Sequence, residues 1–571
     1  MSNVVRRAQG AERFAREEIM VFKKSNRRAD VLIVGAGPSG LIAAKHLTAE
    51  GFSVVCLEQG ERVDAGEFWS DRPEFELMIQ KRWHPNPNVR DLESDYPIDT
   101  RESDVPILMY NAVGGTSIIY GAHWQRFMPS DFRVRSLDGV ADDWPISYED
   151  LEPFYDEMEA EVGVSGLGGD TAFPNLKNPP LPAMPINKMG QKAIEGMDKL
   201  GWHWWPAPNA IATTKYGNLN PCVLRGTCRN GCPEGAKASF DLTHLPVALQ
   251  NGLKLVSGAR VSQILVNDEG LAEGAIYTDR SGRERRQLAE VVIVCCNAVG
   301  TSRLLQNSVS KYFPDGLANS SGLVGRNLML HPYSTVVGQF DEDLESWMGP
   351  AGQTVQSMQF YETDESRGFV RGAKWHVLPG GGPLGAPPKP GAPFDEQWGQ
   401  AFHANRDAAF GKSFEWGVMA EDLPEESNRV VLDNKQTDSD GIPAAKILYN
   451  YSENTKRLSE FHLARAKEAM EAAGATSTIV RPLLTDRSQH NSGASLMATG
   501  HLMGTCRMGN DPKRSVVNQY GQAHDVPNLY VFDGSVFVTS SGFNPTGTIA
   551  AIALRSVKNL IAERRNNKVA T

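Results

Sequence analysis

Residues 31–40 read VLIVGAGPSG, and the segment that begins with them and ends at Glu58 decides the fold expected for this chain. Residues 31–34 form a continuous apolar run, the pattern of a parallel strand that is covered on both faces. The glycine-rich turn follows, residues 41–48 repeat apolar side chains at helical spacing, and residues 54–57 form a second strand. A strand, a glycine turn, a helix and a second strand in this order predict a nucleotide-binding unit.

The three glycines of the turn suit three separate tasks. Gly35 permits the tight turn, Gly37 lets the backbone approach a pyrophosphate, and Gly40 lets the helix pack closely on the strand. The helix N-terminus then faces the phosphates with its free N–H groups. Glu58, at the end of the second strand, can accept the hydroxyl hydrogens of an adenosine ribose. The pattern predicts an unphosphorylated dinucleotide and leaves FAD and NAD both open.

Length and charge restrict the class of protein. The chain has 571 residues, too many for one small core, which favours two domains that are interleaved along the sequence. Lys and Arg number 58 against 68 Asp and Glu, and the formal charge of -10 argues against nucleic-acid or anionic-membrane partners. A small neutral substrate fits this balance better. No run approaches the ~18 apolar residues that span a bilayer, so we expect a soluble protein.

The N-terminal segment and the cysteines bear on location. Residues 1–28 contain Arg6-Arg7, but charged residues occupy the place where an export signal needs an apolar core, so we interpret them as a charged extension. Seven cysteines, an odd number in a chain of this size, indicate reduced thiols rather than a disulfide framework. The sequence therefore predicts a cytoplasmic protein.

Later segments predict further parts of two domains. Runs rich in β-branched residues at 253–266 and 291–296 indicate strands that return to the nucleotide domain, whereas the strands at 413–419 and 429–432 suit an antiparallel sheet. Residues 379–393 are dense in Gly and Pro and form either a mobile lid over a pocket or a surface connection.

Helices are expected at three further places. Residues 147–162 begin with a capping box, residues 457–472 carry one apolar side, and residues 528–562 predict a strand, a turn and a long helix.

A turn near residue 114 has a composition suited to phosphate or flavin. Paired glycines, Gly114-Gly115, stand next to Thr116 and Ser117, so backbone N–H groups can approach an anionic oxygen. A plain tight turn is the alternative.

Three closely spaced thiols stand in a loop of Gly and Pro residues. Cys222, Cys228 and Cys232 can ligate an iron–sulfur cluster, but no fourth cysteine lies nearby, and zinc would lack a ligand for the same reason. We therefore expect no metal, with an iron–sulfur cluster at these three cysteines as the alternative.

Several of these segments together resemble the glucose-methanol-choline (GMC) oxidoreductases. The resemblance is carried by the 35–58 unit, by residues 114–117, by residues 324–327 with His331-Pro332, and by 501-HLMGT-505, and it covers nearly the whole chain. Within that family the chain is most similar to bacterial pyranose oxidases, C-glycoside 3-oxidases and the catalytic subunits of FAD-dependent glucose and gluconate dehydrogenases. The resemblance implies FAD, a discontinuous Rossmann-like FAD-binding domain of α/β type, and an α+β substrate domain built on an antiparallel sheet.

The resemblance also implies domain boundaries. The FAD-binding domain would combine residues 29–125, 240–335 and 495–571, residues 126–239 would form a connecting region with the cysteine loop, and residues 336–494 would bind substrate.

The resemblance carries site residues onto this sequence. Ser39 would join the glycines at the pyrophosphate, Val261 would meet the adenine through its backbone, and Asp533-Gly534 would lie along the flavin chain. The helix N-terminus at Thr546 would point at the pyrimidine edge of the flavin, where its dipole stabilises negative charge. The cofactor-binding residues expected from motif and resemblance together are Gly35, Gly37, Ser39, Gly40, Glu58, Gly114, Gly115, Thr116, Ser117, Val261, Asp533, Gly534 and Thr546.

Two departures from relatives matter. Covalently flavinylated relatives carry a histidine at the position that is Ile119 here, so we expect non-covalent FAD. The cysteine spacing matches the loop that holds a three-iron cluster in some FAD glucose dehydrogenases, and simple oxidases of the family do not need such a cluster.

The resemblance assigns the catalytic pair to His501 and Asn544. Neutral imidazole can take the hydroxyl proton of an alcohol while a hydride leaves the same carbon for flavin N5, and the amide of Asn544 can hold the oxygen. The expected function is oxidation of a secondary hydroxyl of a sugar or glycoside, with electrons passed to O2 or a small quinone. An iron–sulfur sugar dehydrogenase that reduces a cytochrome partner and a non-catalytic binding protein on a flavin fold are the alternatives. A flavin monooxygenase is excluded, because no second G-x-G-x-x-G follows a strand.

Overall fold

The computed structural model describes residues 28–569, except 73–75, 77–81, 91, 93, 174–175, 352, 381–397 and 491–499. The expected N-terminal extension, apart from Arg28, and the Gly/Pro-rich segment from residue 381 onward lie outside the described residues. Among the helices that are described, none combines the length and the apolar character that crossing a membrane requires.

A seven-stranded sheet forms around the predicted nucleotide-binding unit. Strand β1 (Ala29–Val34), helix α2 (Pro38–Ala49) and strand β2 (Val54–Glu58) follow one another as expected. Five strands run parallel in the order β7 (Lys254–Ser257), β2, β1, β10 (Glu284–Val294) and β18 (Leu529–Val531). The first half of β10 extends beyond them and pairs antiparallel with β9 (Ala272–Thr278), which pairs in turn with β8 (Arg260–Val266). The Rossmann-like α/β prediction is confirmed.

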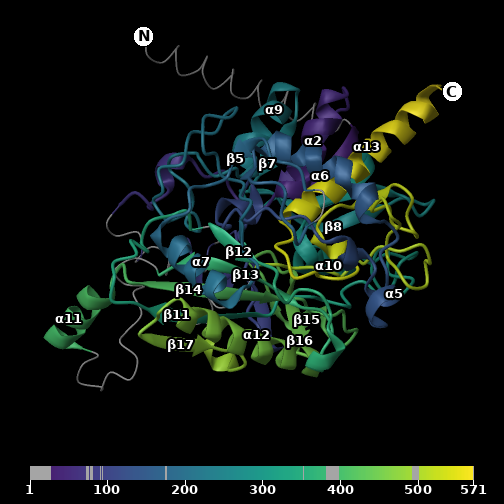
Figure 1. Cartoon of the computed structure of the whole chain (residues 1–571). Helices are drawn as coiled ribbons and strands as arrows, with labels where there is room; N and C mark the ends of the chain where they lie inside the picture. The colour runs from purple at the N-terminus through teal and green to yellow at the C-terminus, as the bar shows by residue number, and fades with distance from the viewer. Residues whose placement is uncertain are drawn as a thin grey trace, which may run out of the picture.

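The apolar run of β1 is explained by burial on both faces of this sheet. Val31 and Ile33 pack with α2 and with α13 (Thr546–Val569), whereas Leu32 and Val34 belong to the core on the other face. Helix α13 packs against both α2 and α6 (Tyr148–Val162), and α2 packs against α9 (Leu245–Gln250), so these four helices gather over one side of the sheet (Figure 1). Ser147 accepts the N–H of Asp150 and starts α6 with the predicted capping box.

A second sheet is antiparallel throughout, as predicted. Its six strands lie in the order β17 (Ser477–Arg481), β11 (Tyr333–Gln339), β14 (Ser413–Ala420), β13 (Ala373–Pro379), β12 (Val355–Ser357) and β6 (Trp205–Pro206). Helices α12 (Glu453–Ala472) and α7 (Lys188–Leu200) cover one face, and α12 lies beside β11 and β17 in Figure 1. Along β13, Trp375 and Val377 join the core beneath these helices, whereas His376 and Leu378 face a cavity.

Strand pairing links segments that the expected boundaries separate. Strand β3 (Ile98–Ser103) pairs parallel with β16 (Pro443–Tyr449), which pairs antiparallel with β15 (Arg429–Thr437). Strand β6 joins the antiparallel sheet from within the expected connecting region. Helix α10 (Asn297–Asn307) packs on β8, β15 and β16 and so bridges the sheets. The domain boundaries remain a prediction.

A substitution at Gly40 tests the close contact between α2 and the preceding turn. A Cβ at this position would lie 2.0 Å from the carbonyl oxygen of Gly35, so Gly40→Ala must push the helix away from the strand. We expect this variant to lose about 1–3 kcal/mol of stability through overpacking. Gly66→Ala is the matched control, because a Cβ there has nothing within 4 Å. Equal thermal unfolding of the two variants would contradict the assignment.

Candidate active site

A cavity of about 1190 Å³ lies between the parallel sheet and the antiparallel sheet. The volume exceeds the usual range for small-molecule sites and leaves room for a dinucleotide beside a substrate. Of the predicted site residues, thirteen line it: Gly35, Gly37, Ser39, Glu58, Gly115, Thr116, Ser117, Val261, His501, Asp533, Gly534, Asn544 and Thr546. Gly40 and Gly114 do not, since Gly40 serves the packing of α2 and Gly114 takes a left-handed conformation (φ 99°) that turns the chain before Gly115.

One end of the cavity has the features of a dinucleotide cradle. Gly37 is the N-cap of α2 and supplies no capping side chain, so the N–H groups at this helix end stay available to an anion. The backbone of Gly115 lies so close that a Cβ on it would sit 2.9 Å from Cα of Gly37. A helix N-terminus that opens into a cavity between two bare backbone segments fits a pyrophosphate.

Glu58 is held firmly at the same end. One carboxylate oxygen accepts the N–H of Ala36 at 2.7 Å and the other accepts the N–H of Gly60 at 2.8 Å. Burial raises the pKa of Glu58 to about 7 in spite of these bonds. The carboxyl group is thereby fixed at the edge of the cavity, where the sequence predicted a ribose contact.

The opposite end brings His501 and Asn544 together, although 43 positions separate them. The Nε2 atom of His501 lies 3.3 Å from Nδ2 of Asn544, and Asn544 stands two residues before the start of α13. Both line the cavity, and burial lowers the pKa of His501 well below the usual value for histidine, so its imidazole is neutral at pH 7.

A second histidine determines which nitrogen of His501 carries the proton. Nε2 of His331 lies 2.7 Å from the carbonyl oxygen of Ser541 and can only donate to it, which leaves Nδ1 of a neutral His331 as an acceptor. Nδ1 of His331 lies 2.7 Å from Nδ1 of His501, so His501 must donate there. The lone pair of His501 is therefore on Nε2, which faces Asn544 and the cavity. This arrangement is that of a preset proton acceptor.

A buried charge network supports the loop that carries Ser541. Ser541 has a left-handed backbone (φ 59°), and its hydroxyl lies 2.9 Å from the hydroxyl of Tyr361. Tyr361 also accepts the N–H of Gly542 and donates to Asp131, which forms an ion pair with Arg371 at 2.5 Å. Each of these side chains is buried.

Sequence reasoning missed His331 and Lys374. His331 stands with Pro332 in a segment that carries the family resemblance, which was a usable signal, but no role was assigned to it. Polar and apolar residues alternate along β13, where Lys374 precedes Trp375, and a lysine in such a pattern usually points into solvent. Here the polar face of the strand turns to the active site, and the Nζ atom of Lys374 donates to Oδ1 of Asn544 at 2.7 Å.

The cysteine loop lies at the cavity. Residues 225–227, Arg229 and Asn230 contribute to the lining. The sulfur atoms of Cys222 and Cys232 each accept a backbone N–H at 3.4 Å, and burial raises the pKa of the Cys222 thiol to about 11. Two of the three sulfur atoms thus have a hydrogen-bond donor, the raised pKa keeps the Cys222 thiol protonated, and the described residues offer no fourth cysteine in this loop.

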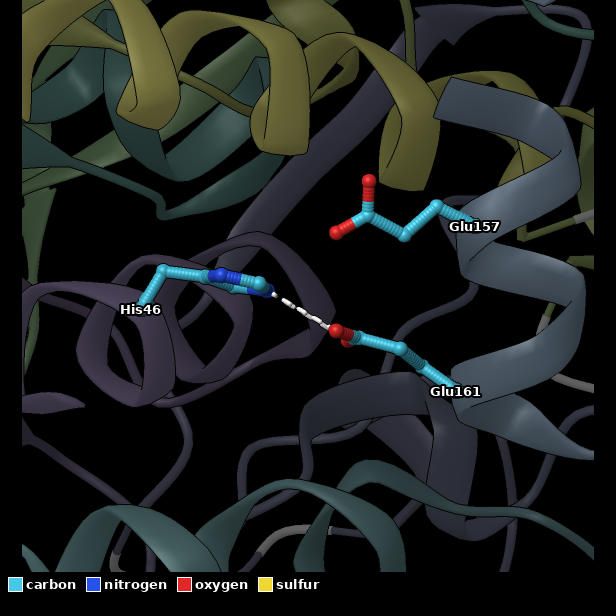
Figure 2. A group of neighbouring side chains, drawn as sticks. All are labelled: His46, Glu157 and Glu161. Atoms are coloured by element: carbon cyan, nitrogen blue, oxygen red, sulfur yellow. Dashed lines mark hydrogen bonds and ion pairs between the residues drawn. The ribbon is translucent and has the colours of Figure 1, made fainter. Parts of the chain in front are cut away.

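Another group of side chains has metal-like geometry. His46 of α2 and Glu157 and Glu161 of α6 point toward one another (Figure 2), with ligand atoms within 4.8 Å. Cations already neutralise both carboxylates, because Lys45 contacts Glu161 at 2.7 Å and Lys558 contacts Glu157. We therefore interpret this group as an ionic contact between helices.

Comparison with known proteins shows the family of this chain. Two family models described as GMC oxidoreductase match residues 29–333 and 424–553. The chain is 38% identical to 2-methyl-1,2-propanediol dehydrogenase of Mycolicibacterium austroafricanum, covering 93% of this chain and 94% of that protein. It is 27% identical to the fructose dehydrogenase large subunit of Gluconobacter japonicus (93% and 98% covered) and 29% identical to paromamine 6'-oxidase of Streptomyces fradiae (94% and 92% covered). The crystal structure of pyridoxine 4-oxidase from Mesorbium loti has the same fold, with a TM-score of 0.61, 18% identity and coverage of 93% and 99%.

The buried His331 should make stability depend on pH. Burial lowers its pKa to about 4, below the value of about 6.5 in an unfolded chain. Its contribution to stability is complete above about pH 6.5 and is lost as the pH falls, because the unfolded chain then binds the extra proton. At pH ~5.5 the loss amounts to about 1.4 kcal/mol.

Replacement of His331 by Gln removes this titration. Urea unfolding at pH ~7.5 and ~5.5 should show a pH-dependent loss of stability that is smaller by about 1.4 kcal/mol in the variant than in the wild type. His244, whose pKa burial also lowers to about 4, titrates in both proteins and cancels from the comparison. The same pH dependence in both proteins would show that His331 is not buried as a neutral imidazole.

Proposed function

Because the chain belongs to the GMC oxidoreductase family, whose members bind FAD and oxidise alcohol or sugar CH–OH groups, we propose that it oxidises a secondary hydroxyl of a sugar or glycoside to a keto-sugar. The observation that carries the proposal is the pair formed by the Nε2 lone pair of His501 and the amide NH2 of Asn544, 3.3 Å apart at one wall of the cavity.

The reaction divides between cofactor and side chains. When bound, FAD supplies the two-electron oxidant. His501 Nε2 takes the hydroxyl proton, and Nδ1–H of His501 stays bonded to His331, which keeps the ring oriented. Asn544 donates an N–H to the same oxygen and thereby orients the C–H bond that breaks, a positional effect that is sensitive to ~1 Å.

A polar wall of the cavity near the catalytic pair suits a substrate with several hydroxyls. It presents Tyr333, Thr335 and His376 from the antiparallel sheet, together with an ion pair between Arg481 and Glu415 at 2.9 Å. These groups offer both donors and acceptors, and Leu378 adds an apolar surface to the cavity lining. Such a mixture favours a pyranose ring over a small apolar alcohol.

We assign the FAD contacts to the predicted residues that line the cradle. The N-terminus of α2 with Gly37 and Ser39 would hold the pyrophosphate, Glu58 the ribose and Val261 the adenine. Asp533-Gly534 would follow the flavin chain, and the N-terminus of α13 at Thr546 would face the pyrimidine edge. Ile119 lines the cavity with a side chain that has no nucleophile, which supports non-covalent FAD.

The electron acceptor is proposed to be O2 or a small quinone, and the cysteine loop to be free of metal. One observation favours a second function, that of a sugar dehydrogenase with an iron–sulfur cluster. The loop of Cys222, Cys228 and Cys232 lies at the cavity, and the sulfur atoms of Cys222 and Cys232 each accept a backbone N–H. A cluster at these cysteines would allow electron transfer from the flavin to a protein partner.

Cofactor content distinguishes these alternatives. Acid precipitation of the purified protein should leave yellow FAD in the supernatant, because Ile119 cannot form a covalent link. Assays for iron and acid-labile sulfide should find far less than one cluster per chain. Flavin that stays on the precipitated chain contradicts the non-covalent assignment, and stoichiometric iron and sulfide favour the dehydrogenase.

Anaerobic bleaching of the flavin tests the function itself. D-Glucose, methyl β-D-glucoside, D-fructose and 2-methyl-1,2-propanediol are compared, with peroxide and dye reduction followed in parallel under air. A sugar or glycoside should react fastest, and His501→Ala should lower the rate of flavin reduction by ~10²–10⁴-fold while FAD content stays normal.

His403→Ala is the control, because this histidine is exposed on helix α11 (Gly399–Ala409). A His501→Ala variant that reduces its flavin at the wild-type rate, or a protein that no sugar bleaches, contradicts the proposal.

A further inference from the structure

Lys374 is a buried lysine beside the catalytic pair. Its side chain is fully buried in β13, and its Nζ atom lies 2.7 Å from Oδ1 of Asn544 and 3.1 Å from Oε1 of Gln353. Both of these partners are amide oxygens, which carry no charge. A buried ammonium with only amide oxygens as partners is unfavourable, and burial lowers the pKa of Lys374 well below its usual value. A lysine retained at such cost next to a catalytic site indicates a task there.

The task follows from the two ends of the Asn544 carboxamide. One end accepts hydrogen bonds and the other donates them, and rotation by ~180° about the last side-chain bond exchanges the two. Nε2 of His501 carries a lone pair, so the carboxamide end that faces it is the NH2 group, and the end 2.7 Å from Nζ of Lys374 is the oxygen, to which the lysine donates in either of its protonation states. Nδ1 of His123 lies 3.1 Å from the same oxygen and can hold it from a second side. The NH2 end therefore faces Nε2 of His501 and the cavity.

We propose that Lys374 is a positioning residue for alcohol oxidation, which holds Asn544 with its NH2 group turned toward the oxygen of the substrate. The inference rests on the proposed function of the site. If the carboxamide were rotated, its oxygen would face the substrate oxygen, repel it, and compete with His501 for the hydroxyl proton. Lys374 excludes that orientation by binding the carboxamide oxygen on the side away from the substrate.

A double-mutant cycle separates this role from simple packing. Lys374→Met keeps the length of the side chain and removes its donor, and Asn544→Ala removes the carboxamide. Anaerobic flavin reduction is measured for the wild type, both single variants and the double variant. The substrate is whichever of D-glucose, methyl β-D-glucoside, D-fructose and 2-methyl-1,2-propanediol reduces the wild-type flavin fastest. FAD content is measured for each protein.

Lys374→Met should lower the limiting rate of flavin reduction by ~10–10²-fold, the range expected when a reacting group is misplaced, with little change in the substrate concentration that gives half the limiting rate. In the Asn544→Ala background the same change should cost nothing further, because Lys374 acts only through Asn544.

Lys237→Met is the matched control. Lys237 is another buried lysine, but it donates to the backbone carbonyls of Ile118 and Cys228 and does not contact Asn544. Any effect of this variant should multiply with that of Asn544→Ala.

The proposal is overturned if Lys374→Met reduces its flavin as fast as the wild type, or if its effect multiplies with that of Asn544→Ala. Lys374→Leu, which also lacks a donor, provides a second cycle with the same expectation, so a Lys374→Met protein that fails to fold does not end the test. The wild-type reaction reports separately on the proposed function, because it does not depend on any of the variants.

Discussion

The active site depends on the charge balance around Arg371. This guanidinium is almost fully buried, and it contacts Glu421 at 2.8 Å, Asp131 at 2.5 Å and Asp138 at 3.2 Å. A buried cation is stable only when its partners stay in place, and removing one partner from such a network typically costs about 3–5 kcal/mol. Asp131 and Glu421 lie 290 positions apart in the chain, so the network fixes distant segments against each other. Tyr361 extends it to the loop of Ser541, and through that loop to the histidine pair.

The parts of the fold that could be predicted from the sequence are those whose packing partners lie close to them along the chain. Strand β1, helix α2 and strand β2 come from one continuous segment, and glycine spacing alone indicates how they pack. The pairing of β3 with β16, and of β6 with β12, joins segments about 150 or more positions apart, and nothing in either short strand names its partner. The alternation of polar and apolar residues along a strand identifies its polar face, but it does not indicate whether that face contacts solvent or another part of the protein.

The site divides in the same way. His501 and Asn544 were identified because they belong to segments that resemble a family, and the structure brings them within hydrogen-bond distance. The side chains that surround and orient these two residues could not be predicted from the sequence. The tautomer of His501 is set by a backbone carbonyl two steps away, through a histidine from a third segment. Lys374 has the sequence context of a surface lysine, and only tertiary packing turns it inward. Residues that act on other side chains rather than on substrate leave the weakest trace in a sequence.

The order of strands in the parallel sheet has a consequence for biosynthesis. Strand β10 lies between β1 and β18, and the cavity wall includes Asp533, Asn544 and Thr546. A chain emerging from the ribosome can form β1, α2 and β2 early, but the cavity residues Asp533, Asn544 and Thr546 become available only once residue 546 has been made. Contacts between such distant segments form late and slowly. The two walls of the cavity can therefore face each other only after translation of nearly all the described residues.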